Sequence, residues 1–180
     1  YHADNNNVTI AASDLKNIGN ATTGTVTLTN AIRLSGNQSD VTAALVTEAS
    51  KVVAATDGTI ANVSDSVNAS QGQAIAAATN IAAAFSGGVE DSTSNLYDTN
   101  NTAITTNFSA IKTDDADVAV TISDADFNAD NNNVTIAATT LSGIGNTTTG
   151  TVTVTNAVKV TGSQSDLTAA LVTEASKVSV

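Results

Sequence analysis

Cysteine, proline, methionine and tryptophan are all absent from this 180-residue chain, and aromatic residues make up only 3% of it. Without cysteine, and with a single histidine, the chain has almost nothing from which to build a transition-metal site or a Cys–His or Ser–His catalytic pair. The lack of methionine leads us to expect a processed product or a part of a longer protein.

Basic residues are also scarce, because six Lys and Arg stand against 17 Asp and Glu, for a net charge of −11. This balance argues against nucleic-acid binding, which requires a basic surface that displaces counterions. No apolar run reaches the length of a transmembrane helix, so we expect no membrane insertion. The charge suits a surface that repels its own copies or that gathers divalent cations.

Threonine, alanine and asparagine dominate the composition, with 30, 31 and 20 residues. Hydrophobic residues make up 41% of the chain, but many of them are alanine, so the buried layers should be thin. Thin cores are typical of stacked repeats, in which each unit leans on its neighbours.

The decapeptide ADNNNVTIAA occurs twice, at Ala3–Ala12 and at Ala129–Ala138. Residues 1–52 align with residues 127–178 without a gap, and 38 of these 52 positions are identical. We therefore divide the chain into three parts: residues 1–52, which match the second copy; residues 53–126, the remainder of a 126-residue repeat; and residues 127–180, the start of that second copy.

Runs of alternating apolar residues predict strands after five positions spaced by 29 to 34 residues: Gly24, Gly58, Gly88, Asp117 and Gly150. Two of these runs end in Ser-Asp, GTIANVSD at 58–65 and DVAVTISD at 117–124, where Asp is expected to turn the backbone or cap the next element. The unit at 89–101 is polar and poorly patterned, and it is expected to be a loop or a decayed strand.

The segments between these runs have helical periodicity. One helix should begin near Ser39 as its N-cap and continue through Val41, Ala44, Leu45, Ala49 and Val52. An alanine-rich helix should carry Ile75, Ala78, Ala82 and Phe85 and end at Gly87-Gly88. Two more helices are indicated by Ile104, Phe108 and Ile111, and by Leu15 and Ile18 before Gly19, repeated as Leu141 and Ile144.

These patterns predict an α/β fold: an elongated repeat array of strand–helix units of about 30 residues, four to each 126-residue repeat. Parallel strands would be joined by right-handed crossovers, with the helices along one side. The alternative is a string of β-rich domains, which threonine at alternate positions of 25–29 suits equally well.

The segments TTGTVTVTNAVKVTGSQSDLTAALV and VAVTISDADF resemble the repeats of very long, low-aromatic surface or secreted proteins of aquatic bacteria, including marine cyanobacteria. The resemblance covers most of the chain and is weakest at 89–113. It implies an extracellular structural or adhesive role and carries over no catalytic residues.

Four oxygen-bearing residues alternate with others after the run VAVTI: Asp124, Asp126, Asn128 and Asp130. This spacing is similar to the start of a calcium loop, but Ala129 and Thr135 stand where an EF-hand has its turn glycine and bidentate glutamate. In an extended strand the four side chains would share one face. Such an acidic ladder either holds Ca²⁺ or is solvated.

Asp114, Asp115 and Asp117 could form a carboxylate pair for acid–base chemistry, although solvated turn residues are the simpler interpretation. His2 is replaced by Asn128 in the second copy and is expected at the surface. The Thr-x-Thr runs at 25–29 and 151–155 resemble ice-binding arrays, which need such a run on every turn rather than once per repeat.

The sequence therefore predicts a non-enzymatic extracellular or cell-surface protein that associates with itself into a fibre, surface layer or adhesin stalk. The alternative is a repeat module that binds a ligand, calcium or ice.

Overall fold

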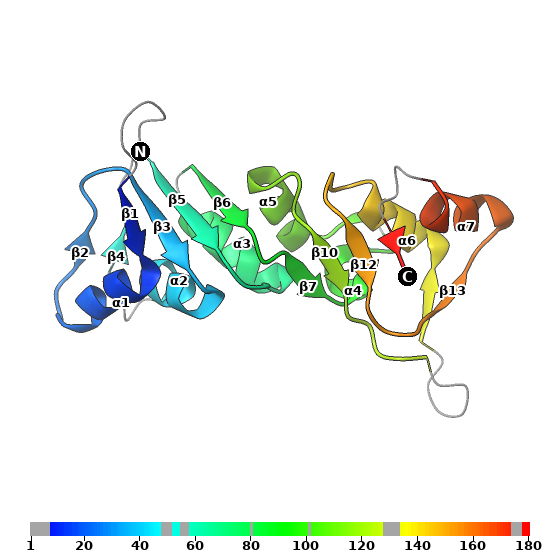
Figure 1. Cartoon of the computed structure of the whole chain (residues 1–180), viewed down its shortest axis with the longest axis horizontal. Helices are drawn as coiled ribbons and strands as arrows, with labels where there is room; N and C mark the ends of the chain where they lie inside the picture. Colours follow the sequence, from blue (N-terminus) through cyan, green and yellow to red (C-terminus); the bar gives the residue numbers. More distant parts are fainter. Residues whose placement is uncertain are drawn as a thin grey trace.

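The computed structural model of the chain describes residues 8–47, 52–54, 58–79, 81–100, 102–127, 134–173 and 178–180. Over these residues the chain forms an elongated mixed α/β fold with seven helices and several parallel sheets (Figure 1). The predicted α/β class is confirmed at this level. The described residues of the two sequence copies lie at opposite ends of the long axis.

The helices are α1 (Ala12–Asn20), α2 (Gln38–Leu45), α3 (Ala69–Ala78), α4 (Thr93–Leu96), α5 (Thr106–Asp114), α6 (Ala138–Gly145) and α7 (Gln164–Leu171). The strands are β1 (Thr9–Ala11), β2 (Val26–Thr27), β3 (Ile32–Gly36), β4 (Val52–Val53), β5 (Thr59–Val63), β6 (Ala82–Phe85), β7 (Val89–Asp91), β8 (Tyr97–Asp98), β9 (Ala103–Ile104), β10 (Val120–Ile122), β11 (Thr135–Ala137), β12 (Val152–Val154), β13 (Lys159–Thr161) and β14 (Val178–Ser179). All five predicted strand starts precede a strand, namely β2, β5, β7, β10 and β12.

Two four-stranded sheets run along the molecule, in the orders β1-β3-β5-β6 and β14-β12-β10-β7. Every strand pair in them is parallel, and paired residues lie between 22 positions apart, as in Ile60 and Ala82, and 32 apart, as in Val120 and Val152. Parallel neighbours need a crossover connection, which the helices supply. Smaller sheets pair β2 with β4 and β11 with β13 in parallel, and β8 with β9 antiparallel.

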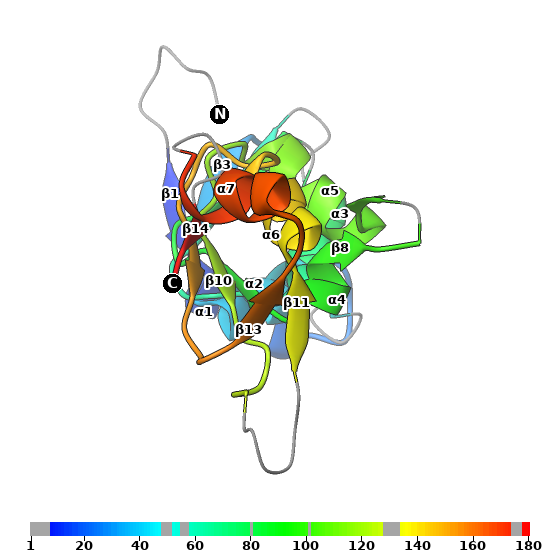
Figure 2. The same ribbon diagram turned by 90° about the vertical axis from the view of Figure 1, so that its right-hand side faces the viewer.

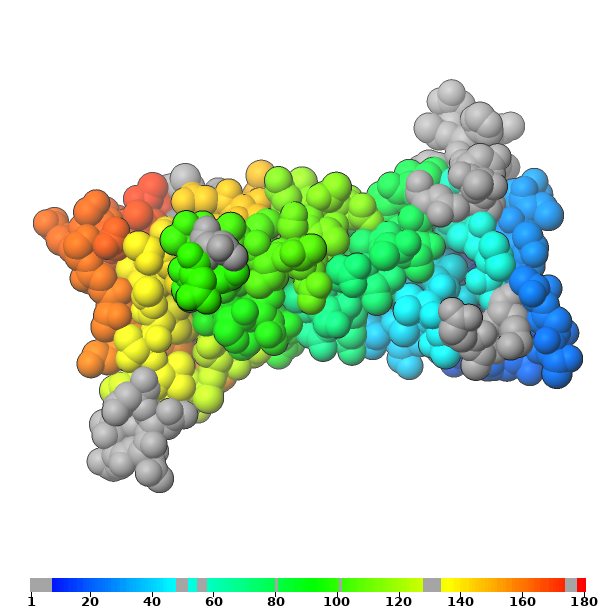
Figure 3. Space-filling model, turned by 180° about the vertical axis from the view of Figure 1, so that it is seen from behind, coloured from blue at the N-terminus to red at the C-terminus, as the bar shows by residue number. Residues whose placement is uncertain are grey.

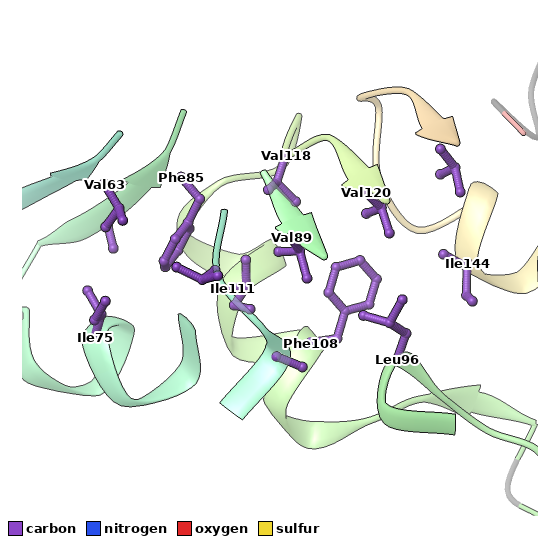
Figure 4. Close-up of a cluster of buried hydrophobic side chains, with 14 of the residues drawn as sticks. Val63, Ile75, Phe85, Val89, Leu96, Phe108, Ile111, Val118, Val120 and Ile144 are labelled. Carbon is purple, nitrogen blue, oxygen red and sulfur yellow. The ribbon is translucent and has the colours of Figure 1, made fainter. Parts of the chain in front are cut away.

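The core lies between these strands and the helices that follow them. Consecutive helices contact one another along the chain, α1 with α2, α2 with α3 and α6 with α7. A view along the long axis places β10 and β14 on one side of the cross-section and α3, α5 and α6 on the other (Figure 2). Strand residues such as Val63 and Val120 point toward Ile75, Phe108 and other helix residues (Figure 4).

Phe85 and Phe108 are the largest fully buried side chains of this core. Burying a side chain of this size contributes roughly 1.5–3 kcal/mol. Most of the other buried positions are occupied by Ala, Val, Leu and Ile, so the buried layer is thin, as the composition predicts.

The predicted helix that continues through Ala82 and Phe85 is wrong. Helix α3 ends at Ala78, and residues 82–85 form β6, which pairs with β5. Ala83 and Phe85 are buried whereas Ala84 is exposed, so the true period is two. Gly87 and Gly88 form the turn between β6 and β7; Gly88 has a φ of +79°, a conformation that glycine adopts without strain.

The N-cap of helix α2 lies two residues before the predicted N-cap Ser39. Asn37 is the N-cap instead, and its side chain accepts a hydrogen bond from the Asp40 amide at 2.8 Å. The helix ends at Leu45, and Val52 lies in β4, while Ala49 falls outside the described residues. The predicted continuation of this helix to Val52 is therefore wrong.

The segment expected to be a loop or a decayed strand contains β7, α4 and β8. Ile104, predicted to be helical, lies in β9, and α5 starts at Thr106 with Thr105 as its N-cap. Asparagine and threonine caps satisfy the free N–H groups of a helix start, which explains why polar residues begin helices here.

The two sequence copies adopt the same order of elements. Strand β1 and helix α1 correspond to β11 and α6, and α2 corresponds to α7 at an offset of 126 residues. The predicted short helix at Leu15–Ile18 is confirmed in both copies.

Candidate functional site

Two of the four residues of the predicted cation ladder lie in the described part of the chain, while Asn128 and Asp130 lie outside it. Asp124 follows β10, and its two carboxylate oxygens accept hydrogen bonds from the Thr93 amide at 2.7 Å and the Thr93 hydroxyl at 3.0 Å. Asp126 accepts one from the Ala157 amide at 3.0 Å. Thr93 lies 31 residues before Asp124, whereas Ala157 lies 31 residues after Asp126. The two carboxylates therefore bind different segments of the chain, one earlier and one later in the sequence.

No group of three or more His, Cys, Asp or Glu residues that could hold a metal ion occurs among the described residues. Calcium binding at Asp124, Asp126, Asn128 and Asp130 therefore stays a prediction. His2 also lies outside the described residues.

Aspartates at or near the ends of strands cap helices that come earlier in the chain. The Asp65, Asp91 and Asp124 carboxylates accept the amide N–H of Gln38, Ala69 and Thr93, respectively, the first residues of α2, α3 and α4. An acceptor at a helix start satisfies an unpaired N–H group and interacts well with the helix dipole. The sequence predicts that the Ser-Asp steps turn the backbone or cap the next element, whereas these aspartates cap the helix that comes before.

Asp114 and Asp115 occupy the edge of β6. Their carboxylates accept hydrogen bonds from the Ala83 amide at 3.0 Å and the Phe85 amide at 2.6 Å. Burial raises the pKa of both carboxyl groups, and for Asp115 the neighbouring Asp117 raises it further. The interpretation of Asp114 and Asp115 as solvated turn residues is therefore wrong, because they replace the carbonyl groups of a missing neighbouring strand.

The Thr-Thr-Gly motif of the second copy binds a segment that comes about 30 residues earlier in the chain. The Thr148 hydroxyl accepts a hydrogen bond from the Gly150 amide at 2.9 Å and donates one to the Val118 carbonyl at 2.6 Å. In the first copy, Thr22 also accepts from Gly24, at 3.0 Å. Among the described residues no carbonyl receives the Thr22 hydroxyl proton, because no described strand precedes β1.

The same difference holds for the neighbouring donors. The Asn156 side chain donates to the Asp124 carbonyl at 2.6 Å, and the Ala157 amide donates to Asp126. Their equivalents in the first copy, Asn30 and Ala31, have no such acceptor in the part of the chain that the structure describes. Free hydrogen-bond donors thus gather at this end of the molecule, which we call the N-terminal end face and which comprises residues 8–32.

Apolar side chains are exposed on the N-terminal end face. Ile18 is 54% exposed, whereas its repeat equivalent Ile144 is fully buried. A hollow of about 300 Å³ is lined by Val8, Ile10, Leu28 and Ile32, among others. The equivalents of Ile10 and Leu28 in the second copy, Ile136 and Val154, are buried.

The opposite end, which we call the C-terminal end face, comprises the described residues of 159–180. Leu34 is fully buried in the first copy, but its equivalent Val160 is only partly buried, and Val172 is 72% exposed. Strands β13 and β14 are sheet edges here. The Gln164 amide, equivalent to the Gln38 amide that Asp65 caps, has no carboxylate partner among the described residues. Both end faces therefore lack contacts that the same sequence makes inside the molecule.

The two Thr-x-Thr runs do not lie beside each other. Strand β2 pairs with β4, and β12 pairs with β10 and β14.

Among the described helices, none has the length and hydrophobicity to cross a lipid bilayer.

Sequence reasoning missed the aspartate caps because the partners lie 22 to 31 residues apart, as Asp91 and Ala69 or Asp124 and Thr93 do. The signal that the sequence offers is an aspartate at the end of a strand or two residues after it. Comparison of the chain with protein-family models, with curated proteins and with solved structures found no match.

Proposed function

We propose that this chain is a non-enzymatic extracellular structural protein, an array of strand–helix units that associates with itself through its end faces into a fibre, surface layer or adhesin stalk. The observation that carries the proposal is the contrast between Ile18 and Ile144, one sequence position that is exposed at an end and buried inside. A surface built for burial but left open is a docking surface.

Parallel pairing of residues 22 to 32 positions apart supports the array. Each unit buries its apolar face against the next one, as in other stacked repeats. Apolar side chains are exposed on both end faces, and in stacked repeats such a face is covered by a polar cap or by a partner. The exposed Ile18 and Val172 favour a partner.

We propose a second copy of the chain as that partner. The N-terminal end face offers donors, the Thr22 hydroxyl, the Asn30 side chain and the Ala31 amide. The C-terminal end face offers the edge strands β13 and β14, and an edge strand carries free carbonyl groups. Donors on one face and acceptors on the other favour head-to-tail stacking, which forms open filaments.

The remaining parts of the proposal rest on composition and resemblance. The carboxylates of Asp91, Asp115 and Asp124 bind backbone amides, which is a structural use and supports a non-enzymatic role. The extracellular location is supported by the resemblance of the Thr/Ala/Asn-rich repeats to surface and secreted proteins.

Sedimentation velocity and negative-stain microscopy over a range of protein concentrations test self-association. We expect linear assemblies that grow with concentration, and we expect I18K to abolish them because a charge would be buried in the contact. The matched control is I81K, since Ile81 is 49% exposed but belongs to neither end face. The proposal is wrong if wild type stays monomeric at all concentrations, or if I18K and I81K assemble equally well.

A further inference from the structure

A cavity of about 550 Å³ opens between the segment 93–105 and the start of the second sequence copy. One wall comes from α4, β8 and Thr105, and the other from β11 and α6. These elements contact one another, and the view along the long axis places α4 and β8 beside β11 and α6 (Figure 2). The volume falls in the range of roughly 300–1,000 Å³ typical of small-molecule pockets.

The wall formed by β8 and β9 departs from the rest of the fold. It is the only antiparallel strand pair among the described residues. Space-filling atoms of this segment form a raised surface next to those of β11 and α6 (Figure 3). In stacked repeats, insertions of this kind map to one face, which is often the binding face.

Thr140 of α6 supplies an unused polar group to the cavity. Its side chain lines the cavity, and the residue is only 4% exposed. No described residue forms a hydrogen bond with its hydroxyl group. The Thr140 hydroxyl can therefore donate to or accept from a polar ligand atom in the cavity without giving up a contact within the described residues.

Tyr97 is the aromatic part of the lining. A Cβ atom placed on Gly143 would lie 2.4 Å from Cε2 of Tyr97, so the ring packs directly on the backbone of α6. Only glycine at position 143 permits this contact. The ring is thereby held in the wall of the cavity.

The lining has the chemistry of a carbohydrate site. Hydroxyl groups of Thr93, Ser94, Thr99, Thr105 and Thr140 combine with the Tyr97 ring and with Ile136 and Ala137. Threonine and serine hydroxyls both donate and accept hydrogen bonds, as sugar hydroxyls do, and aromatic rings offer an apolar surface with a polar tip. Among the described residues of the lining there is no Lys, Arg or His, so an anionic ligand would lack a counter-charge there.

From these contacts we propose that the cavity between β8–β9 and α6 binds a neutral saccharide of one or two sugar units, with Thr140 as a hydrogen-bonding residue and Tyr97 as the ring platform. A bound cation fits less well, because Asp98 is the single carboxylate among the described lining residues and already accepts the Asn100 amide at 2.9 Å. The described lining shares no residue with either end face, so self-assembly and saccharide binding can be tested by separate variants.

Titration of the ¹⁵N-labelled full chain with maltose, cellobiose and lactose, followed by NMR, tests the proposal. We expect saturable shifts confined to the lining residues for at least one of these sugars. Thr140→Val keeps the shape of the side chain but removes the hydroxyl, and should weaken binding about five- to tenfold. Thr139→Val is the matched control, since Thr139 is exposed on the same helix and does not line the cavity.

Tyr97→Phe provides a second variant that keeps the ring, and it should retain binding within about fivefold. The proposal is overturned if no sugar gives a saturable shift up to about 10 mM, or if T140V and T139V bind equally. It is also overturned if glucuronate binds more tightly than the neutral sugars, because the lining would then select anions.

Discussion

Asp124 accepts hydrogen bonds from both the amide and the hydroxyl of Thr93, the residue that begins α4, 31 positions earlier in the chain. The contact joins the segment after strand β10 to the start of helix α4, which comes earlier in the chain. Asp65 and Asp91 make the same amide contact with Gln38 and Ala69. Because the same contact occurs at three places, it is a recurring way in which this fold joins segments that are distant in the sequence.

Replacing Asp124 should therefore destabilise the fold. We expect D124A to lower the free energy of unfolding by about 1–2 kcal/mol, the typical cost of a lost helix cap. D124N should cost less, since an amide oxygen still accepts one of the two bonds. Urea unfolding followed by circular dichroism measures both. D14A is the control, and its loss should be about 0.3 kcal/mol, from the helix dipole alone; an equal loss for D14A and D124A would contradict the capping role.

The equivalent isoleucines of the two copies should respond very differently to truncation. Ile144→Ala should cost about 2–5 kcal/mol because it leaves a cavity in the core. Ile18→Ala should change the stability of the monomer by less than about 0.5 kcal/mol, as expected for a surface position. The two isoleucines occupy equivalent positions of α1 and α6, so the change in helix propensity on substitution by alanine is similar. Thermal unfolding at low protein concentration provides the comparison, and similar losses would show that the two environments do not differ.

The aspartates at the edge of β6 should give the stability an unusual pH dependence. Because burial raises the pKa of Asp114 and Asp115, the folded chain takes up protons before the unfolded chain does. These groups penalise folding at neutral pH, and the penalty fades as the pH falls through their raised values toward 3.8, the ordinary value. D115N should gain relative to wild type at neutral pH and lose this advantage on acidification.

Asp40 should behave in the opposite way. Its hydrogen bond to Lys16 lowers the pKa of Asp40, so its contribution is present above 3.8 and is lost as the pH falls below that value. D40N should thus be less stable than wild type at neutral pH, and the difference should vanish in acid. Urea unfolding of D115N, D40N and wild type between about pH 7 and pH 3 tests both pH predictions. A pH-independent difference for either variant would contradict its assignment.

The calcium ladder is testable through Asp126. Both oxygens of Asp124 already bind Thr93, whereas Asp126 has one carboxylate oxygen that no described residue contacts. We expect calcium to raise the melting temperature of wild type, EGTA to reverse this, and D126N to lose the effect. An unchanged melting temperature of wild type on addition of EGTA would remove the proposal of a structural calcium site.

Local patterns in the sequence determined much of the framework. Alternating apolar residues after glycine located β5 and β12, and the spacing of Leu15 and Ile18 located α1. These features follow from periodicity within a few residues, which neighbouring elements do not alter. The repeat itself, with its offset of 126, is likewise visible in the sequence alone.

Only the tertiary structure decided the rest. Ala82–Phe85 satisfies a helical spacing, yet it forms a strand because β5 offers it an edge to pair with. Asp114 and Asp115 look like turn residues, but the unpaired amides of β6 draw them inward. Ile18 and Ile144 occupy equivalent positions of the two copies, yet one is exposed and the other is buried by the elements that lie beside it. Burial and hydrogen bonding between segments that are far apart in the chain are properties of the tertiary fold, so no short window of sequence contains them.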